Sequence, residues 1–88
     1  MRDIIISDHA RYEIVHRQLS EAVIIEVVQN PQQVVKLSRG RIVCQSKYYD
    51  FVENKEMLMR VIYEEKQTSL FVVTAYRTSK IDKYWEGV

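Results

Sequence analysis

The first candidate site lies near the N-terminus, in a stretch expected to be helical. His9, Glu13 and His16 follow one another at spacings of four and three residues, so on a helix their side chains fall within about 60° of one another. Two imidazoles and a carboxylate arranged in this way can reach one metal ion. The alternative is a solvated polar face on which Glu13 pairs with Arg17, one helical turn later. The residues alone leave both interpretations open.

The second candidate is a charge inside an apolar run. Arg60 lies within residues 57–63, and a charge in such a strand must face water or be paired, because burying it unpaired is costly. If the following hairpin loop has an odd number of residues, Arg60 shares a sheet face with Val72, Thr74 and Tyr76. A guanidinium, a hydroxyl and a phenol then lie side by side. The alternative is an ordinary arginine that faces solvent.

The third candidate is the segment 74–80, which combines two basic residues, a phenol and three hydroxyls. Arginine can bind a phosphodiester through two parallel hydrogen bonds, and lysine binds it as a point charge. A strand end that opens into a loop is a frequent place for a site, although a basic loop without function is also common. Aromatic side chains in the strands and the tail either stack on bases or simply pack. They are Tyr48, Tyr49, Tyr63, Tyr76, Tyr84 and Trp85.

Other catalytic patterns are missing from the sequence. Gly40 and Gly87 are its only glycines, so there is no glycine loop that could hold a phosphate, and no Ser-His-Asp pattern is recognisable. Cys44 is the single cysteine, which cannot form an internal disulfide and fits an inert small apolar residue. The net charge of +1 argues against a broad basic face but allows a local basic cleft.

The elements that must position these residues form one domain, residues 1–88, because a second core would not fit. Ser7 and Ser20 fit N-caps of two helices, and Asn30-Pro31 ends the second one. Polar and apolar residues then alternate with period two, as in strands joined by short turns. We expect helices over 8–17 and 21–29, strands over 33–37, 41–49, 57–64 and 69–77, and a helical turn within 78–88. Ile4–Ile6 is either a short edge strand or an extended lead-in. The sequence therefore predicts an α+β fold in which an N-terminal helical hairpin packs on a four-stranded antiparallel sheet.

The apolar runs are short. The longest have four residues, for example Ala22–Ile25, far fewer than the roughly 20 needed to span a bilayer. The N-terminus also lacks the apolar stretch of a signal peptide. We therefore expect a cytoplasmic protein without a membrane partner.

Five short motifs follow one another along nearly the whole chain. They are Ser7-Asp8-His9-Ala10, Arg17-Gln18-Leu19-Ser20, Asn30-Pro31, Arg60-Val61 and Val73-Thr74-Ala75-Tyr76-Arg77-Thr78-Ser79-Lys80. Their order and spacing resemble a family of small prokaryotic domains of unknown function, with the pattern S-x-H-A, R-G-I-S, N-P, R-V and T-V-Y-R-T-S-K. Gln18 stands where glycine is usual in that pattern, and Ala75 where valine is. The family is itself similar to the RelE/ParE superfamily of toxins.

The resemblance implies a RelE-like endoribonuclease toxin of a toxin–antitoxin system that uses no metal and no cofactor. The 2′-hydroxyl of the RNA attacks the adjacent phosphate in such enzymes, so RNA is cut and DNA is not. By this resemblance His9 is the acid or base, Arg17 and Arg60 are phosphate clamps, and Tyr76 orients the substrate or shuttles a proton. Substrate-binding roles are implied for Thr74, Arg77 and Lys80.

The implied partner is RNA, and a cognate antitoxin protein and a homodimer are left open. The near-neutral charge favours free RNA, or one specific RNA, over the ribosome-bound substrate of the most basic relatives.

Two other classes of protein compete with the enzyme. A non-catalytic interaction module of the same fold would bind an antitoxin or a target through a sheet edge or an apolar patch. Convergence of His9, Arg60 and Tyr76 in one cleft favours the enzyme, and divergence favours the module. A metal-binding structural protein rests only on Glu13 and the two histidines.

Overall fold

The computed structural model describes residues 2–87, which form a five-stranded mixed sheet, three α-helices and one 3₁₀ turn. In chain order the elements are β1 (Asp3–Ile6), α1 (Asp8–His16), α2 (Glu21–Gln29), β2 (Gln33–Lys36), η1 (Ser38–Gly40), β3 (Arg41–Asp50), β4 (Lys55–Glu65), β5 (Ser69–Thr78) and α3 (Ile81–Tyr84). The α+β class is confirmed. None of the helices in this range is long and apolar enough to cross a membrane.

The strands lie in the order β1-β5-β4-β3-β2 across the sheet. β1 pairs in parallel with β5, and the other neighbouring strands are antiparallel. The prediction of a four-stranded antiparallel sheet is therefore wrong, because Ile4–Ile6 belongs to a fifth strand that runs parallel to the last one. A parallel pair needs a long crossover connection, which the chain between β1 and β5 supplies.

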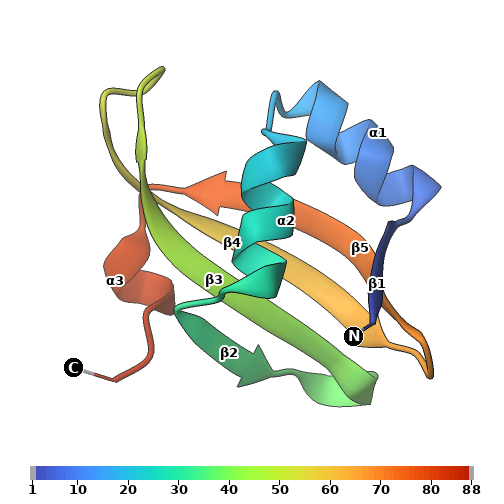
Figure 1. The fold of residues 1–88 in the computed structure, drawn as a ribbon. Coiled ribbons are helices and arrows are strands. Elements are labelled where there is room, and N and C mark those ends of the chain that lie inside the picture. Colours follow the sequence, from blue (N-terminus) through green and yellow to red (C-terminus); the bar gives the residue numbers. More distant parts are fainter. Residues whose placement is uncertain (1, 88) are drawn as a thin grey trace.

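Two serines begin the first two helices, as predicted. The Ser7 side chain accepts a hydrogen bond from the backbone N–H of Ala10, and the Ser20 side chain accepts one from Val23. Each serine thereby satisfies a free donor of the first helical turn. α1 packs along β5, whereas α2 packs over β3 and β4 (Figure 1). The two helices contact separate parts of the sheet, so the predicted helical hairpin is not confirmed.

The hydrophobic core lies between α1, α2 and one face of the sheet, which we call the helix face. Its buried members are Ala10, Ile14, Ile24, Val27, Val28, Cys44, Met59, Val61, Val72 and Ala75. Successive residues of a strand point to opposite faces. Val61 therefore packs against the helices, while its neighbour Arg60 points to the other side, which we call the Arg60 face.

The pairing of β4 with β5 decides which predicted residues share the Arg60 face. Arg60 lies opposite Tyr76, and Thr74 follows on the same face, as predicted. The register then shifts at a β-bulge in which Val73 is the extra residue. A shift of one residue reverses the face to which the following side chains point. Val72 consequently lies in the core on the helix face, and the prediction that it shares the Arg60 face is wrong.

Replacing Ser7 by alanine removes the N-cap of α1. We expect Ser7→Ala to lower the free energy of unfolding by about 1 kcal/mol, measured by urea denaturation. Ser38→Ala is the matched control, because Ser38 is exposed in η1. Equal stabilities of Ser7→Ala and the control would contradict the capping role.

Candidate functional site

α1 takes the place of a strand along part of the β5 edge. β1 ends at Ile6, and the backbone N–H of Ser7 donates to the carbonyl of Val72 at 3.1 Å. Beyond Val72, no strand within residues 2–87 pairs with β5 on this side. Nη1 of Arg17, at the far end of α1, donates to the carbonyl of Ala75 at 2.8 Å. A side chain thus satisfies an acceptor that a longer β1 would have bound.

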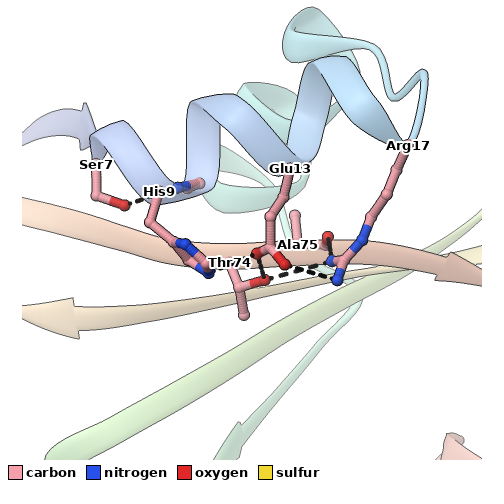
Figure 2. A network of polar contacts seen from close by, with 7 residues as sticks. Ser7, His9, Glu13, Arg17, Thr74 and Ala75 are labelled. Atoms are coloured by element: carbon pink, nitrogen blue, oxygen red, sulfur yellow. Dashed lines mark hydrogen bonds and ion pairs between the residues drawn. The ribbon is translucent and has the colours of Figure 1, made fainter.

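The carboxylate of Glu13 joins three of the predicted site residues. It accepts a hydrogen bond from the hydroxyl of Thr74, and its Oε2 lies 2.7 Å from Nη2 of Arg17. Its Oε1 lies 3.3 Å from Nε2 of His9. Figure 2 shows these side chains converging between α1 and β5. We call His9, Glu13, Arg17 and Thr74 the Glu13 cluster.

Exposure separates the roles within the Glu13 cluster. The side chain of Glu13 is only 15% exposed, whereas that of His9 is 73% exposed. The hydrogen bond from Thr74 and the positive charges of Arg17 and His9 hold the pKa of the Glu13 carboxyl below its ordinary value, although burial acts in the opposite direction. A sheltered carboxylate that stays ionised can fix the orientation of an imidazole. The imidazole itself remains open to a ligand from solvent.

Four strands each contribute one residue to a second polar row. Gln33, Gln45, Arg60 and Tyr76 lie opposite one another on β2, β3, β4 and β5. Nε of Arg60 donates to Oε1 of Gln45 at 2.8 Å, and Nη1 donates to the hydroxyl of Tyr76. Nε2 of Gln45 donates to Oε1 of Gln33 at 2.7 Å. We call this row the Arg60 ladder. It gives a charge in a central strand the partners that such a position requires.

Aromatic rings complete the surroundings of Arg60. Its guanidinium lies 4.2 Å from the ring centroid of Tyr84, and the rings of Tyr84 and Tyr76 meet edge to face. A hydrogen bond from Lys83 and the positive charges of Lys83 and Arg60 lower the pKa of the Tyr84 phenol, against an opposing effect of burial. Lys47, further along the same face of β3, lies 4.1 Å from the Trp85 ring. The Arg60 face thus carries several cations among aromatic rings.

Thr74 and Tyr76 link the two groups of residues. They are two positions apart on β5 and point to the same face, a step of about 6.6 Å along a strand. The Glu13 cluster, which α1 holds at the β5 edge, therefore reaches the Arg60 face through Thr74. Arg60 and Tyr76 are in direct contact, as predicted, while His9 joins them through Glu13 and Thr74 and not directly.

Arg77, one of the predicted substrate-binding residues, lies apart from this surface. Arg77 lies opposite the buried Met59, on the helix face. Its Nη1 is 3.5 Å from a carboxylate oxygen of Asp50, a residue that also accepts from the backbone N–H groups of Val52 and Glu53. Arg77 thus supports the β3–β4 turn. Lys80 is exposed in the short segment after β5.

The metal interpretation gains no support from the arrangement of α1. The ring of His16 stacks on Tyr12 at 5.7 Å between centroids, while Glu13 is bound to Arg17 and Thr74. Between residues 2 and 87 no three His, Cys, Asp or Glu side chains lie close enough to hold a metal ion.

Three residues have a larger place in the site than the sequence indicates. From the sequence, Glu13 is expected only to bind a metal or to pair with Arg17, and Tyr84 only to pack or to stack on a base. Gln45 is not anticipated at all, although it is fully buried and contacts Arg60. The sequence signal for Gln45 is a polar residue between apolar and small neighbours in a predicted strand. Its contact with Arg60 could not be predicted, because the sequence does not give the register of the strand pairing.

A groove of about 890 Å³ lies elsewhere, between the end of α2 and the strands β1, β4 and β5. It is lined by Arg2, Asp3, Ile4, Ile25, Val28, Gln29, Asn30, Tyr63, Glu65 and Leu70. Of the candidate residues only the aromatic Tyr63 borders it, and none of the predicted catalytic or substrate-binding residues does. Its size alone names no ligand, whereas the Glu13 cluster and the Arg60 ladder carry defined chemistry.

The two groups of residues together offer an imidazole and a guanidinium group at the β5 edge, and a guanidinium group and a phenol on the Arg60 face. Such a set can exchange a proton and bind an anion such as a phosphodiester. Comparisons of the chain with family models, with curated proteins and with solved structures give no match.

The lowered pKa of Glu13 predicts how its contribution to stability depends on pH. A carboxyl group whose pKa is lower in the folded state stabilises the fold above its ordinary pKa, and the contribution is lost as the pH falls through the lowered value. We expect Glu13→Gln to be less stable than the wild type at about pH 7 and to approach it at about pH 3. Urea denaturation across this range measures the difference.

Glu56→Gln is the matched control, because Glu56 is exposed on β4. A stability difference between Glu13→Gln and the wild type that stays constant over the whole pH range would contradict the role of the ionised carboxylate.

Proposed function

We propose that the protein is a metal-independent endoribonuclease of the RelE-like toxin type, cleaving RNA through attack by the substrate's own 2′-hydroxyl. One observation carries the proposal. An exposed imidazole, held by a sheltered carboxylate at the β5 edge, is linked through Thr74 to the face of the sheet that carries a paired arginine and tyrosine. This surface supplies a proton-transfer group and cations, which are the two requirements of phosphodiester transesterification.

His9 is the proposed proton-transfer group. In the reaction the 2′-oxygen forms a bond to phosphorus, the bond from phosphorus to the 5′-oxygen breaks, and a 2′,3′-cyclic phosphate remains. The proton of the 2′-hydroxyl passes to a base, and the leaving 5′-oxygen takes up a proton from an acid. His9 serves as acid or base in one of these transfers, because its side chain is open to solvent while Glu13 fixes its ring.

The proposed phosphate clamps are Arg17 and Arg60. Negative charge grows on the phosphate oxygens in the transition state, and fixed cations stabilise it. Thr74 and Tyr76 lie beside these cations and orient the substrate. Lys80 adds a weaker electrostatic contribution. Lys47 and Lys83 give the same surface a local basic character in a chain of near-neutral charge.

The second candidate function is a protein-interaction module of the same fold. Phe51 and Val52, at the turn between β3 and β4, are 86% and 84% exposed. Asp50 holds this turn by accepting from the backbone N–H groups of Val52 and Glu53. Two apolar side chains presented on an ordered turn can bind an antitoxin or a target protein.

Cleavage of RNA distinguishes the ribonuclease from the interaction module. We expect the purified protein to cleave single-stranded RNA in the presence of EDTA and to leave a 2′,3′-cyclic phosphate, detected by mass spectrometry of the products. The same oligonucleotide with 2′-O-methyl groups stays intact, because it has no free nucleophile. Cleavage of the methylated strand, or no cleavage of any RNA, contradicts the proposal, and the second outcome favours the interaction module.

Two pairs of variants test the named residues. We expect His9→Ala to lower the rate of RNA cleavage about 10²–10⁴-fold, the usual contribution of a general acid or base. His16→Ala is its matched control, since His16 stacks on Tyr12 on the same helix, and it keeps the wild-type rate. Arg60→Ala likewise loses activity, whereas Arg39→Ala, in the exposed η1 turn, does not. Equal effects within either pair contradict the assigned roles.

A further inference from the structure

The C-terminal segment Ile81–Glu86 is tied to the Arg60 face by the two glutamines of the Arg60 ladder. Nε2 of Gln33 donates to the carbonyl of Glu86 at 2.7 Å, and the backbone N–H of Glu86 donates to Oε1 of Gln33 at 3.0 Å. Nε2 of Gln45 donates to the carbonyl of Tyr84 at 3.0 Å. The segment is therefore held through its backbone at two points, on either side of Trp85.

Held in this way, the segment leaves Arg60 poorly placed to bind a phosphate. The Tyr84 ring covers its guanidinium, with 4.2 Å between the central carbon and the ring centroid. A guanidinium grips a phosphate through two parallel N–H bonds from one edge. Here Gln45 already occupies Nε and Tyr76 already occupies Nη1. Each edge that could make a two-bond grip therefore has one donor engaged by a residue that itself contacts the segment, because Gln45 donates to the Tyr84 carbonyl and the Tyr76 ring meets the Tyr84 ring edge to face.

The attachment of the segment is weak compared with that of the sheet. α3 has only four residues, none of them buried. Segments with few buried contacts open at a small fraction of the global free energy of unfolding. The segment can therefore lift while the sheet and the core stay folded.

We propose that Ile81–Glu86 is an autoinhibitory strap, which covers Arg60 at rest and must lift before a phosphate group can bind there. This inference rests on the proposed function, in which Arg60 is a phosphate clamp. A ligand that binds only the open state has its apparent affinity reduced by the fraction of molecules that are open. Contacts of the strap with Gln33 therefore set the activity of the resting protein.

Chemical modification of arginine by phenylglyoxal reports on the strap without any need for catalysis. The full-length protein is treated with the reagent, and peptide mass spectrometry gives the modification rate of Arg60 relative to Arg39, which is exposed in η1. We expect Arg60 to react more slowly than Arg39 in the wild type. Gln33→Ala removes the attachment of Glu86 and raises the relative rate for Arg60 roughly fivefold or more.

The matched control is Gln32→Ala. Gln32 is the neighbouring glutamine, but its hydrogen bonds go to Ser46 and to the backbone of Lys47 and not to the strap. This variant keeps the wild-type rate for Arg60. Tyr84→Ala uncovers the guanidinium directly and keeps the test decisive should Gln33→Ala fail to fold. The strap is overturned if Arg60 already reacts as fast as Arg39 in the wild type, or if Tyr84→Ala leaves its rate unchanged.

Cleavage assays on the same variants separate the strap from the ribonuclease. Faster RNA cleavage by Gln33→Ala than by Gln32→Ala supports both proposals. A raised modification rate for Arg60 without RNA cleavage by any variant supports the strap and overturns the ribonuclease. Cleavage by the wild type with no change of either rate in Gln33→Ala and Tyr84→Ala overturns the strap and keeps the ribonuclease.

Discussion

The outer edge of β5 obtains its hydrogen-bond partners from two different elements along its length, first β1 and then α1. β1 serves the first part, but it has only four residues, and the chain turns into α1 at Ser7. From there α1 lies against the edge, and the side chain of Arg17 binds the Ala75 carbonyl. Glu13 lies one helical turn from Arg17 and therefore beside it. The Glu13 carboxylate also contacts Thr74 and His9. The same contacts that close the sheet edge thereby assemble the Glu13 cluster, so structure and proposed chemistry share one set of bonds.

The second constraint is a cation in a central strand. Arg60 cannot remain unpaired at this position, because burying an unpaired charge is costly. Polar side chains from the neighbouring strands bind it, including the fully buried Gln45. These partners hold the guanidinium in one orientation, as a binding site requires. They also engage the donors that a phosphate would need. The same glutamines bind the backbone of the C-terminal segment, so the position of that segment and the availability of Arg60 are coupled.

Local signals in the sequence were sufficient for most elements. The N-caps Ser7 and Ser20 and the change from helical to period-two spacing predicted helices and strands that the structure contains. These local signals do not show which distant strands pair with each other. The parallel pairing of β1 with β5 could not be predicted, because neither strand carries a sequence pattern that identifies its partner. For the site, alternation predicted that Arg60 and Tyr76 share a face only on the condition of an odd hairpin loop, and their pairing depends on the register shift at the bulge. The bulge at Val73, which sends Val72 to the core, has no marker in the sequence. The role of Glu13 depends on where α1 lies against β5, and this is a tertiary contact.

The most direct measurement is a double-mutant cycle on RNA cleavage with His9→Ala, Arg60→Ala and the double variant. Groups that act together in one transition state lose most of their joint contribution when either is removed. If the Glu13 cluster and the Arg60 ladder form one site, the double variant cleaves RNA within about threefold of the weaker single variant. Losses that multiply would mean that the two residues act independently, and an inactive wild type would remove the ribonuclease altogether. Either result would contradict a single site shared by both groups of residues.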